Sequence, residues 1–160
     1  MGQVMMDEIR ARGWRPQAIG GMTMGADPIV TAVSILSSQK VQTRAPARTK
    51  DVDIAGYFIH GFLVRKAEKA HGMGQRVEGF QEQGASVVIV DDVCTTGSST
   101  VQAIEAARQF GFRIIGVACL VEREEAGGRG AVQQAAAPSL FIPVFKSSEI
   151  KAAHLRLKNQ

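Results

Sequence analysis

The sequence predicts an α/β fold in which a doubly wound, mostly parallel sheet is flanked by helices. The main observation is an unbroken β-branched run at residues 87–90, which is typical of a strand buried on both faces of a parallel sheet. A second apolar run, at residues 113–121, follows a segment with helical apolar spacing. Strands that alternate with helices favour parallel pairing through crossover connections. Because the chain has 160 residues and no internal repeat, we expect a single domain over residues 1–160.

The other helices and strands are expected from apolar spacing and capping residues. Val4, Met5 and Ile9 share one side of a short opening helix. Asp27 followed by Pro28 is typical of a helix start, since a polar cap precedes a first-turn proline. Strands are expected at residues 18–23, 57–64, 87–90, 113–121 and 140–144, and later helices at residues 101–110 and 147–157.

The segments between these elements are predicted as loops. Residues 37–53 are polar and basic, so an exposed loop or hairpin is expected there. Residues 66–79 carry charges and glycines without an apolar period, which is typical of a mobile loop. A charged, glycine-rich loop is expected at residues 122–130.

The chain is expected to end in an edge strand and a helix. Pro143 cannot donate a hydrogen bond to a neighbouring strand, which places the last strand at a sheet edge. In the terminal helix, Ile150 and Leu155 are expected to point inward.

Composition narrows the class of protein. Hydrophobic residues make up 45% of the chain and charged residues 21%, which is ordinary for a globular domain. No apolar run reaches the ~20 residues that span a bilayer, and no secretory signal is visible, so no membrane partner is expected. Cys94 and Cys119 form no disulfide framework and lack zinc-ligand spacing. A reducing, cytoplasmic location is predicted.

The positive charge of the chain allows two kinds of partner. A net charge of +4 and a pI near 9.4 suit either nucleic acid or a polyphosphate. Basic residues gather within residues 40–50 and 65–76, but neither segment interleaves aromatic residues as a base-stacking surface does. We therefore predict a small anionic substrate and no nucleic acid.

Two carboxylates and a hydroxyl-rich loop follow the buried strand. Asp91 and Asp92 come first, and the loop consists of Thr95, Thr96, Gly97, Ser98 and Ser99. Ligands of open α/β sheets bind at the carboxyl ends of strands, and free N–H groups before a helix attract an anion. Asp91 and Asp92 suit sugar hydroxyls instead, so the pattern predicts a ribose 5-phosphate. An acid pair alone is also typical of a helix cap beside a turn, but the whole run is more specific.

A basic segment follows another strand on the same side of the predicted sheet. It contains Arg65, Lys66, Lys69 and His71 and is bounded by glycines. In isolation such a segment is also typical of a solvated surface. A diphosphate leaving group, however, needs cations that arrive with the substrate and exclude water.

Together, these two segments resemble the motifs of the orotate phosphoribosyltransferases, which are type I phosphoribosyltransferases. Residues 87–100 resemble the family's motif for 5-phosphoribosyl 1-diphosphate (PRPP), and Arg65-Lys66-x-x-Lys69-x-His71-Gly72 resembles its catalytic loop. The resemblance extends from about Gly2 to the C-terminus. It implies the type I phosphoribosyltransferase fold. It also implies transfer of the phosphoribosyl group to orotate, which gives orotidine 5′-monophosphate and diphosphate in de novo pyrimidine biosynthesis.

The resemblance assigns roles to individual residues. Lys69 resembles the family's catalytic lysine, and Asp91 and Asp92 resemble the catalytic pair that holds the ribose hydroxyls. Arg123 resembles the arginine that binds the orotate carboxylate, and a guanidinium suits a carboxylate in two-point contact. Among three glutamates, Arg123 is also typical of a surface ion pair. The implied PRPP contacts are Arg65, Lys66, His71, Thr23, Thr95, Thr96, Gly97, Ser98 and Ser99, and Thr95 also lies where the family contacts orotate.

The resemblance also implies a cofactor and a partner subunit. Magnesium (Mg2+) would bridge oxygens of the diphosphate and the ribose, and no side chain is assigned as a metal ligand. The loop at residues 65–79 would act in the active site of the neighbouring subunit of a homodimer. The transition state would be oxocarbenium-like, so no protein nucleophile is required and Cys94 is not assigned as one.

The chain departs from the family at its N-terminus. It begins inside the helix that follows a hood over the orotate ring, so we expect either a shortened sequence or a protein without the hood, with weaker orotate binding. Two alternatives stay open. A phosphoribosyltransferase for another base would not need Lys69, His71 or Arg123. A non-catalytic PRPP-binding regulator would need a DNA-binding domain or a basic RNA-binding face, and the sequence offers no room for an added DNA-binding domain.

Overall fold

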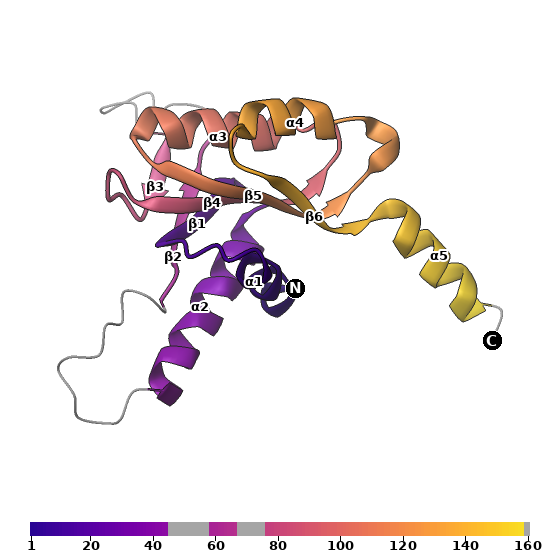
Figure 1. The fold of residues 1–160 in the computed structure, drawn as a ribbon, viewed down its shortest axis with the longest axis horizontal. Helices are drawn as coiled ribbons and strands as arrows, with labels where there is room; N and C mark the ends of the chain where they lie inside the picture. Colours follow the sequence, from indigo (N-terminus) through magenta and orange to yellow (C-terminus); the bar gives the residue numbers. More distant parts are fainter. Residues whose placement is uncertain (45–57, 67–75, 159–160) are drawn as a thin grey trace.

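The computed structural model describes residues 1–44, 58–66 and 76–158, which form a six-stranded sheet with helices on both faces (Figure 1). The strands are β1 (Ala18–Met22), β2 (His60–Val64), β3 (Val77–Gly79), β4 (Ser86–Cys94), β5 (Arg113–Glu122) and β6 (Phe141–Lys146). The helices are α1 (Gly2–Ala11), α2 (Asp27–Arg44), α3 (Ser98–Phe110), α4 (Arg129–Ala136) and α5 (Ser147–Lys158), with a 3-10 turn at Glu124–Ala126.

The sheet is wound in two directions from its centre. Its strand order is β3-β2-β1-β4-β5-β6, and each neighbouring pair is parallel except β2 and β3. The prediction of a doubly wound, mostly parallel sheet is confirmed. The winding reverses between β1 and β4, and ligands of such sheets bind at the carboxyl ends of the strands at this point.

Strand β4 is covered on both faces, as its unbroken apolar run predicts. Val88 and Val90 belong to a core with α1 and α2, whereas Val87 and Ile89 belong to a core on the side of α3. All four side chains are fully buried. Burial of each of these side chains stabilises the folded state by about 1.5–3 kcal/mol. The strand that carries the acid pair is therefore held strongly in the core.

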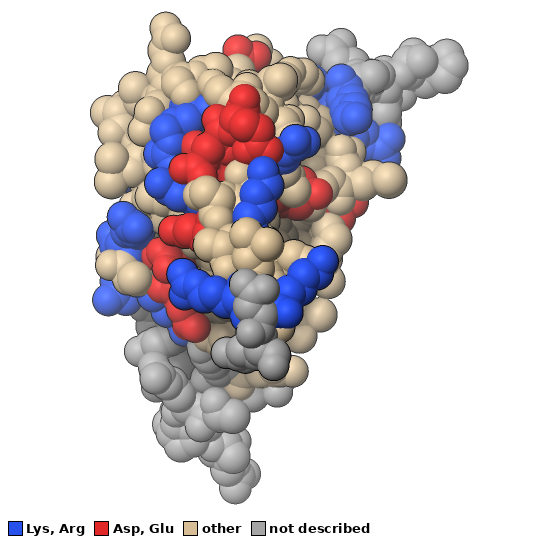
Figure 2. Space-filling view, turned by 90° about the vertical axis from the view of Figure 1, so that its right-hand side faces the viewer, with Lys and Arg blue, Asp and Glu red and all other residues tan. Residues whose placement is uncertain are grey.

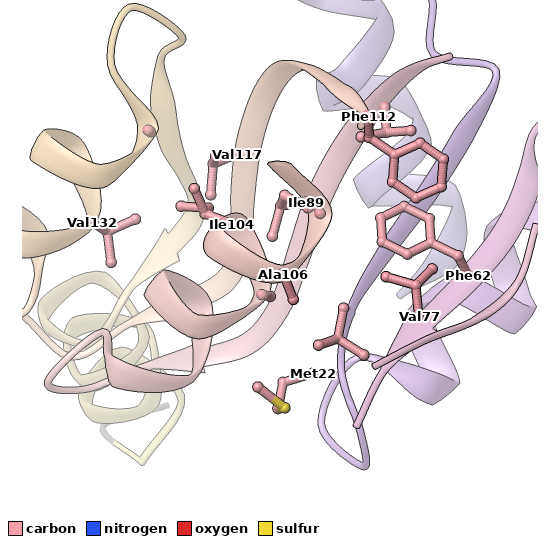
Figure 3. Close-up of a cluster of buried hydrophobic side chains, with 14 of the residues drawn as sticks. Met22, Phe62, Val77, Ile89, Ile104, Ala106, Phe112, Val117 and Val132 are labelled. Carbon is pink, nitrogen blue, oxygen red and sulfur yellow. The ribbon is translucent and has the colours of Figure 1, made fainter. Parts of the chain in front are cut away.

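The core beneath α3 and α4 lies next to the predicted site. Figure 3 shows Ile104 and Val132 in this core, with the rings of Phe62 and Phe112 packed at its other side. The centroids of those two rings are 4.8 Å apart. This packing fixes both helices on the sheet and thereby fixes the loops that precede them.

The loop predicted at residues 37–53 is wrong in its first part, because α2 continues to Arg44. The Ser37 hydroxyl is buried, donates to the Ser34 carbonyl at 2.8 Å and accepts from the Ile59 N–H at 3.0 Å. This tertiary contact supports the helix beyond the point at which its apolar spacing ends. Residues 45–53 lie outside the described residues.

The loop predicted at residues 66–79 is wrong at its end, where β3 pairs antiparallel with β2. Val77 lies opposite Val64 and is 2% exposed. A strand of three residues is too short to show an apolar period, and β2 supplies its partner. The preceding strand begins at His60 rather than at residue 57.

The C-terminal third contains one helix that the sequence does not predict, α4, and one strand that it does. Strand β6 lies at the sheet edge, as expected from Pro143. Helix α5 forms, but the inward orientation predicted for Ile150 and Leu155 is wrong, since they are 45% and 60% exposed. The reason is visible in Figure 1, where α5 projects away from the sheet.

Helix α1 forms as predicted, but one of the three side chains expected on its apolar side is not buried. Met5 and Ile9 are buried as expected, whereas Val4 is 38% exposed. Val4 lies one position from the buried stripe, so its side chain points to solvent. Among the described residues, no helix is both long enough and apolar enough to cross a membrane.

Candidate active site

The acid pair lies where the winding of the sheet reverses. Asp91 and Asp92 belong to the last residues of β4, next to the loop that follows β1. A Cβ atom at Gly25 would lie 2.6 Å from Asp92 Oδ1, and one at Gly21 would lie 2.0 Å from the Val90 carbonyl oxygen. Because Gly21 lacks a Cβ atom, β1 packs directly against the backbone of β4, and because Gly25 lacks one, the loop after β1 packs directly against the Asp92 carboxylate. Half-buried Thr23 lies in the same loop.

The two neighbouring carboxylates have different surroundings. Asp91 is 5% exposed, and its Oδ2 accepts a hydrogen bond of 2.6 Å from Thr100 Oγ1. Its Oδ1 accepts the Asp92 N–H at 3.0 Å. Burial raises the pKa of Asp91 to about 6, against the opposing effect of the Thr100 hydrogen bond. Asp92 is exposed and accepts the Val93 N–H at 2.7 Å, so Asp92 is the carboxylate that a ligand reaches more easily.

The hydroxyl-rich loop lies at the start of α3. Gly97 caps this helix with a φ of +77°, and no side chain in the described part of the protein caps its N–H groups. Helix N-termini with free N–H groups attract anions through those groups and the helix dipole. The surrounding hydroxyls are accessible, since Thr95 is half-buried and Thr96, Ser98 and Ser99 are exposed. The arrangement suits a phosphate monoester.

Arg123 follows β5 at the same edge of the sheet. Its backbone N–H donates to the Cys94 carbonyl at 2.9 Å, which holds it beside the end of β4. Its exposed side chain pairs with Glu125, with Nε 3.1 Å from Oε1. The surface ion pair that the sequence also allows is therefore present. Hydrogen bonds from its own backbone, from Ser147 and from Arg123 lower the pKa of Glu125 to about 2.

The basic segment after β2 is described only at its ends. Arg65 Nε lies 2.8 Å from Glu78 Oε1, and the Arg65 N–H donates to the Arg76 carbonyl at 2.9 Å. Lys66 is exposed. Lys69 and His71 lie outside the described residues, so their predicted roles stay predictions.

The two cysteines are buried and unpaired thiols. Cys94 is the last residue of β4, and it is 1% exposed. Burial raises the pKa of the Cys94 thiol and raises that of Cys119 to about 12. Neither thiol is poised to act as a thiolate near neutral pH.

Sequence reasoning misses three residues that support the hydroxyl-rich loop. Glu122 is predicted in a loop, but it is the buried last residue of β5 and pairs with Arg129 at the start of α4. Gly128 donates its N–H to the Thr95 carbonyl at 3.0 Å. The available signal is the pair of adjacent glycines just before Arg129, which marks a close backbone approach.

Positively and negatively charged side chains are mixed on the face of the molecule near α5. Figure 2 faces the side from which α5 projects and shows Lys and Arg interleaved with Asp and Glu. One pair joins Lys146 Nζ and Glu124 Oε1 at 3.4 Å. The net charge of +4 is therefore not gathered into one basic surface on the face that this view shows, which favours a small anionic ligand.

Comparison with known proteins places these features in context. The phosphoribosyl transferase domain family matches residues 31–134. The chain is 35% identical over 150 residues to the orotate phosphoribosyltransferase of Aquifex aeolicus, covering 94% of this chain and 71% of that protein. It is 38% identical over 138 residues to that of Rhodopirellula baltica, covering 84% of this chain and 64% of that protein.

Solved structures show the same likeness. The crystal structure of Mycobacterium tuberculosis orotate phosphoribosyltransferase in complex with PRPP has a TM-score of 0.63 and 30% identity, covering 89% of this chain and 69% of that chain. A phosphoribosyltransferase from Corynebacterium diphtheriae has a TM-score of 0.68 and 31% identity, with coverages of 94% and 74%. The chain spans 64% of the Rhodopirellula protein and 74% of the Corynebacterium one.

Proposed function

Because the chain belongs to the phosphoribosyltransferase family, and within it to the orotate phosphoribosyltransferases, we propose that it transfers the phosphoribosyl group of PRPP to orotate. The products are orotidine 5′-monophosphate and diphosphate, a reaction of pyrimidine (UMP) biosynthesis. The observation that carries this proposal is the placement of exposed Asp92 beside the open N-terminus of α3 at the reversal point of the sheet. A group that binds hydroxyls next to one that binds an anion suits a ribose 5-phosphate.

The described residues divide the proposed work between the two ends of the substrate. The N–H groups and hydroxyls at residues 95–99 hold the 5-phosphate, while Asp92 orients the ribose hydroxyls. A ring nitrogen of orotate then bonds to C1 of the ribose as the bond from C1 to the diphosphate oxygen breaks. That oxygen keeps the electron pair, and the proton of the ring nitrogen passes to solvent.

Arg123 is proposed to hold the orotate carboxylate. It must first exchange the carboxylate of Glu125 for that of the substrate. The two side chains are 53% and 46% exposed. Exposed ion pairs contribute only about 0.2–1 kcal/mol, so this exchange is inexpensive.

The donor set near Asp92 fits a magnesium ion that is bound mainly by the substrate. Among the described residues, no three His, Cys, Asp or Glu side chains gather as a metal site. Mg2+ is commonly held by one or two carboxylates together with substrate phosphates and waters. Asp92 is the described carboxylate best placed to hold it, and the ion would neutralise charge on the departing diphosphate.

Three features of the proposal come from the family resemblance alone. Lys69 is the proposed catalytic lysine, and His71 contacts the diphosphate beside Arg65 and Lys66. The loop at residues 65–79 acts in the neighbouring subunit of a homodimer. We also place the protein in the cytoplasm, where the free thiols of Cys94 and Cys119 stay reduced.

The test follows the absorbance of orotate in a mixture of the purified protein, PRPP and magnesium. We expect conversion that disappears in Lys69→Ala and persists in Lys158→Ala, a matched change at an exposed lysine near the end of α5. Binding of ribose 5-phosphate without conversion of any base contradicts the enzyme and favours a regulator. Conversion of another base in place of orotate identifies a different phosphoribosyltransferase.

A further inference from the structure

An ion pair between a buried carboxylate and a partly exposed guanidinium joins the end of β5 to the start of α4, since the Arg129 side chain is 37% exposed. Glu122 is 3% exposed, and Arg129 Nε donates to its Oε1 at 2.7 Å. Arg129 Nη2 donates to Glu122 Oε2, so the contact has two points. The guanidinium also lies over the Phe141 ring, 5.6 Å from its centroid. A two-point contact between planar groups fixes orientation as well as distance, and a buried carboxylate depends on its partner.

The residue before Arg129 lies directly against the phosphate loop, by which we mean residues 95–97. The Gly128 N–H donates to the Thr95 carbonyl at 3.0 Å. A Cβ atom at Gly128 would lie 2.2 Å from that same oxygen and 2.7 Å from the Gly97 nitrogen. The two backbone segments therefore touch with no side chain between them, and the shape of the phosphate loop depends on the position of Gly128.

These contacts form a chain from β5 through α4 to the phosphate loop. Glu122 holds Arg129, and Arg129 sets the position of the adjacent Gly128. We propose that Glu122 and Arg129 are positioning residues that act through Gly128 to hold the phosphate loop in its anion-binding shape. The identity of the ligand, a ribose 5-phosphate, rests on the proposed function, whereas the packing does not.

The same ion pair also sets the spacing between the two ends of the site. Arg123 follows Glu122 directly, and its N–H donates to the carbonyl of Cys94, one residue before the phosphate loop. Because Glu122 is the last residue of β5, its position also determines the distance between Arg123 and the phosphate loop. Loss of the ion pair is expected to affect binding of the phosphate first, because Gly128 touches that loop directly.

Arg108 offers a matched control, since it joins α3 to α4 at their opposite end. Its Nη1 donates to the Ala135 carbonyl at 2.7 Å, and its Nη2 donates to the Ala136 and Ala137 carbonyls at 3.1 Å and 2.9 Å. Both arginines tie down α4 through several hydrogen bonds. Only Arg129 lies next to the residue that touches the phosphate loop.

The first experiment uses two glycines of the same turn and measures the binding of ribose 5-phosphate by calorimetry. Gly128 has a φ of −71°, so Gly128→Ala is free of backbone strain and adds only the clash with the backbone of the phosphate loop. Gly130→Ala is its control, because a Cβ atom there meets nothing within 4 Å. We expect Gly128→Ala to weaken binding about tenfold or more, since small misplacements of binding groups are costly. Binding equal to that of Gly130→Ala would overturn the proposal.

The second experiment compares Arg129→Met with Arg108→Met and includes Arg129→Lys as the conservative change. We expect Arg129→Met to raise the Kd of ribose 5-phosphate and the KM of PRPP about tenfold, with a smaller change in kcat. Arg129→Lys keeps the charge but loses the two-point contact, so partial recovery is expected. Arg108→Met is expected to lower the thermal midpoint without changing the Kd. Equal weakening in both Met variants would reduce Arg129 to a structural role and refute the proposal.

Failure of this proposal is distinguishable from failure of the proposed function. If the protein binds ribose 5-phosphate but does not convert orotate, and Arg129→Met loses that binding, then the activity is wrong and the positioning role stands. If orotate is converted and Arg129→Met leaves the KM of PRPP unchanged, then the activity stands and the positioning role is wrong.

Discussion

Two loops meet at the carboxyl edge of the sheet, and their polar groups are used in opposite ways. The phosphate loop after β4 leads into α3, where the hydroxyls of Ser98 and Ser99 are exposed and no described side chain caps the helix. In the turn after β5, Glu124 accepts from the Ser148 hydroxyl and Glu125 accepts from the Ser147 hydroxyl at 2.8 Å. The first loop keeps donors ready for a ligand, whereas the second satisfies its charges with neighbours. An anion site thus needs both open donors and a satisfied support beside them.

The two loops also contain glycines with the same backbone shape and different surroundings. Gly97 has a φ of +77° and Gly127 a φ of +73°. A Cβ atom at Gly97 would lie 2.5 Å from Val132 Cγ2 and 3.0 Å from the Gly128 oxygen, whereas one at Gly127 would meet nothing within 4 Å. Both positions favour glycine for its backbone, but only Gly97 is also enclosed.

The largest effect is expected from alanine substitution at the two left-handed glycines. Both Gly97→Ala and Gly127→Ala force alanine into the left-handed region, which costs about 1–2 kcal/mol. Gly97→Ala adds overpacking against Val132 and Gly128, which costs about 1–3 kcal/mol more. We therefore expect a greater loss of unfolding free energy in urea for Gly97→Ala, with loss of ribose 5-phosphate binding only in that variant. Equal losses in the two variants would show that enclosure at Gly97 is unimportant.

The second expected effect is a difference in pH dependence. Burial raises the folded-state pKa of Asp91 from 3.8 to about 6, so the native state binds this proton more tightly than the unfolded state does. The stabilisation that Asp91 gives by binding this proton is fully present below pH ~4 and is lost as the pH rises through ~6. The free energy of unfolding changes by up to about 3 kcal/mol over this range. The pKa of Glu125 is lowered to about 2, so its contribution has the opposite sign and is lost as the pH falls towards that value.

Urea unfolding at several pH values between 4 and 7 measures the Asp91 contribution, with Asp91→Asn as the reference. We expect the wild-type protein to lose stability relative to Asp91→Asn as the pH rises through this range. Parallel curves for the two proteins would contradict the raised pKa. Glu125→Gln serves as the control above pH ~5.5, where Glu125 is ionised in both the folded and the unfolded protein, so that its removal leaves the slope there unchanged.

What the sequence predicts well is local. The β-branched run of β4, the acid pair after it and the helix pattern after Gly97 are contiguous, so their order along the chain also gives their order in space. The carboxyl ends of parallel strands share one edge, and this rule places Arg123 beside the same site.

What the sequence does not predict depends on contacts between distant residues. Asp91 and Asp92 are identical in sequence, yet Asp91 is buried because it points to Thr100 on α3. Ser37 extends α2 through a bond to Ile59, which lies 22 residues away. Glu122 carries a charge in a segment of charges and glycines, and only the position of α4 shows that it is buried. No local pattern distinguishes these residues from their solvated neighbours.

The smallest effect is expected at Arg123, whose side chain is paired with Glu125. Glu125→Gln removes the carboxylate that competes with orotate, whereas Glu124→Gln is its matched control because Glu124 pairs with Lys146. Since an exposed pair contributes about 0.2–1 kcal/mol, we expect the KM of orotate to fall by about 1.5- to 5-fold in Glu125→Gln only. The KM of PRPP should not change, because its phosphate lies at the other loop. A fall of equal size in Glu124→Gln would indicate a general charge effect, and an unchanged KM of orotate in Glu125→Gln would mean that Glu125 does not compete with it.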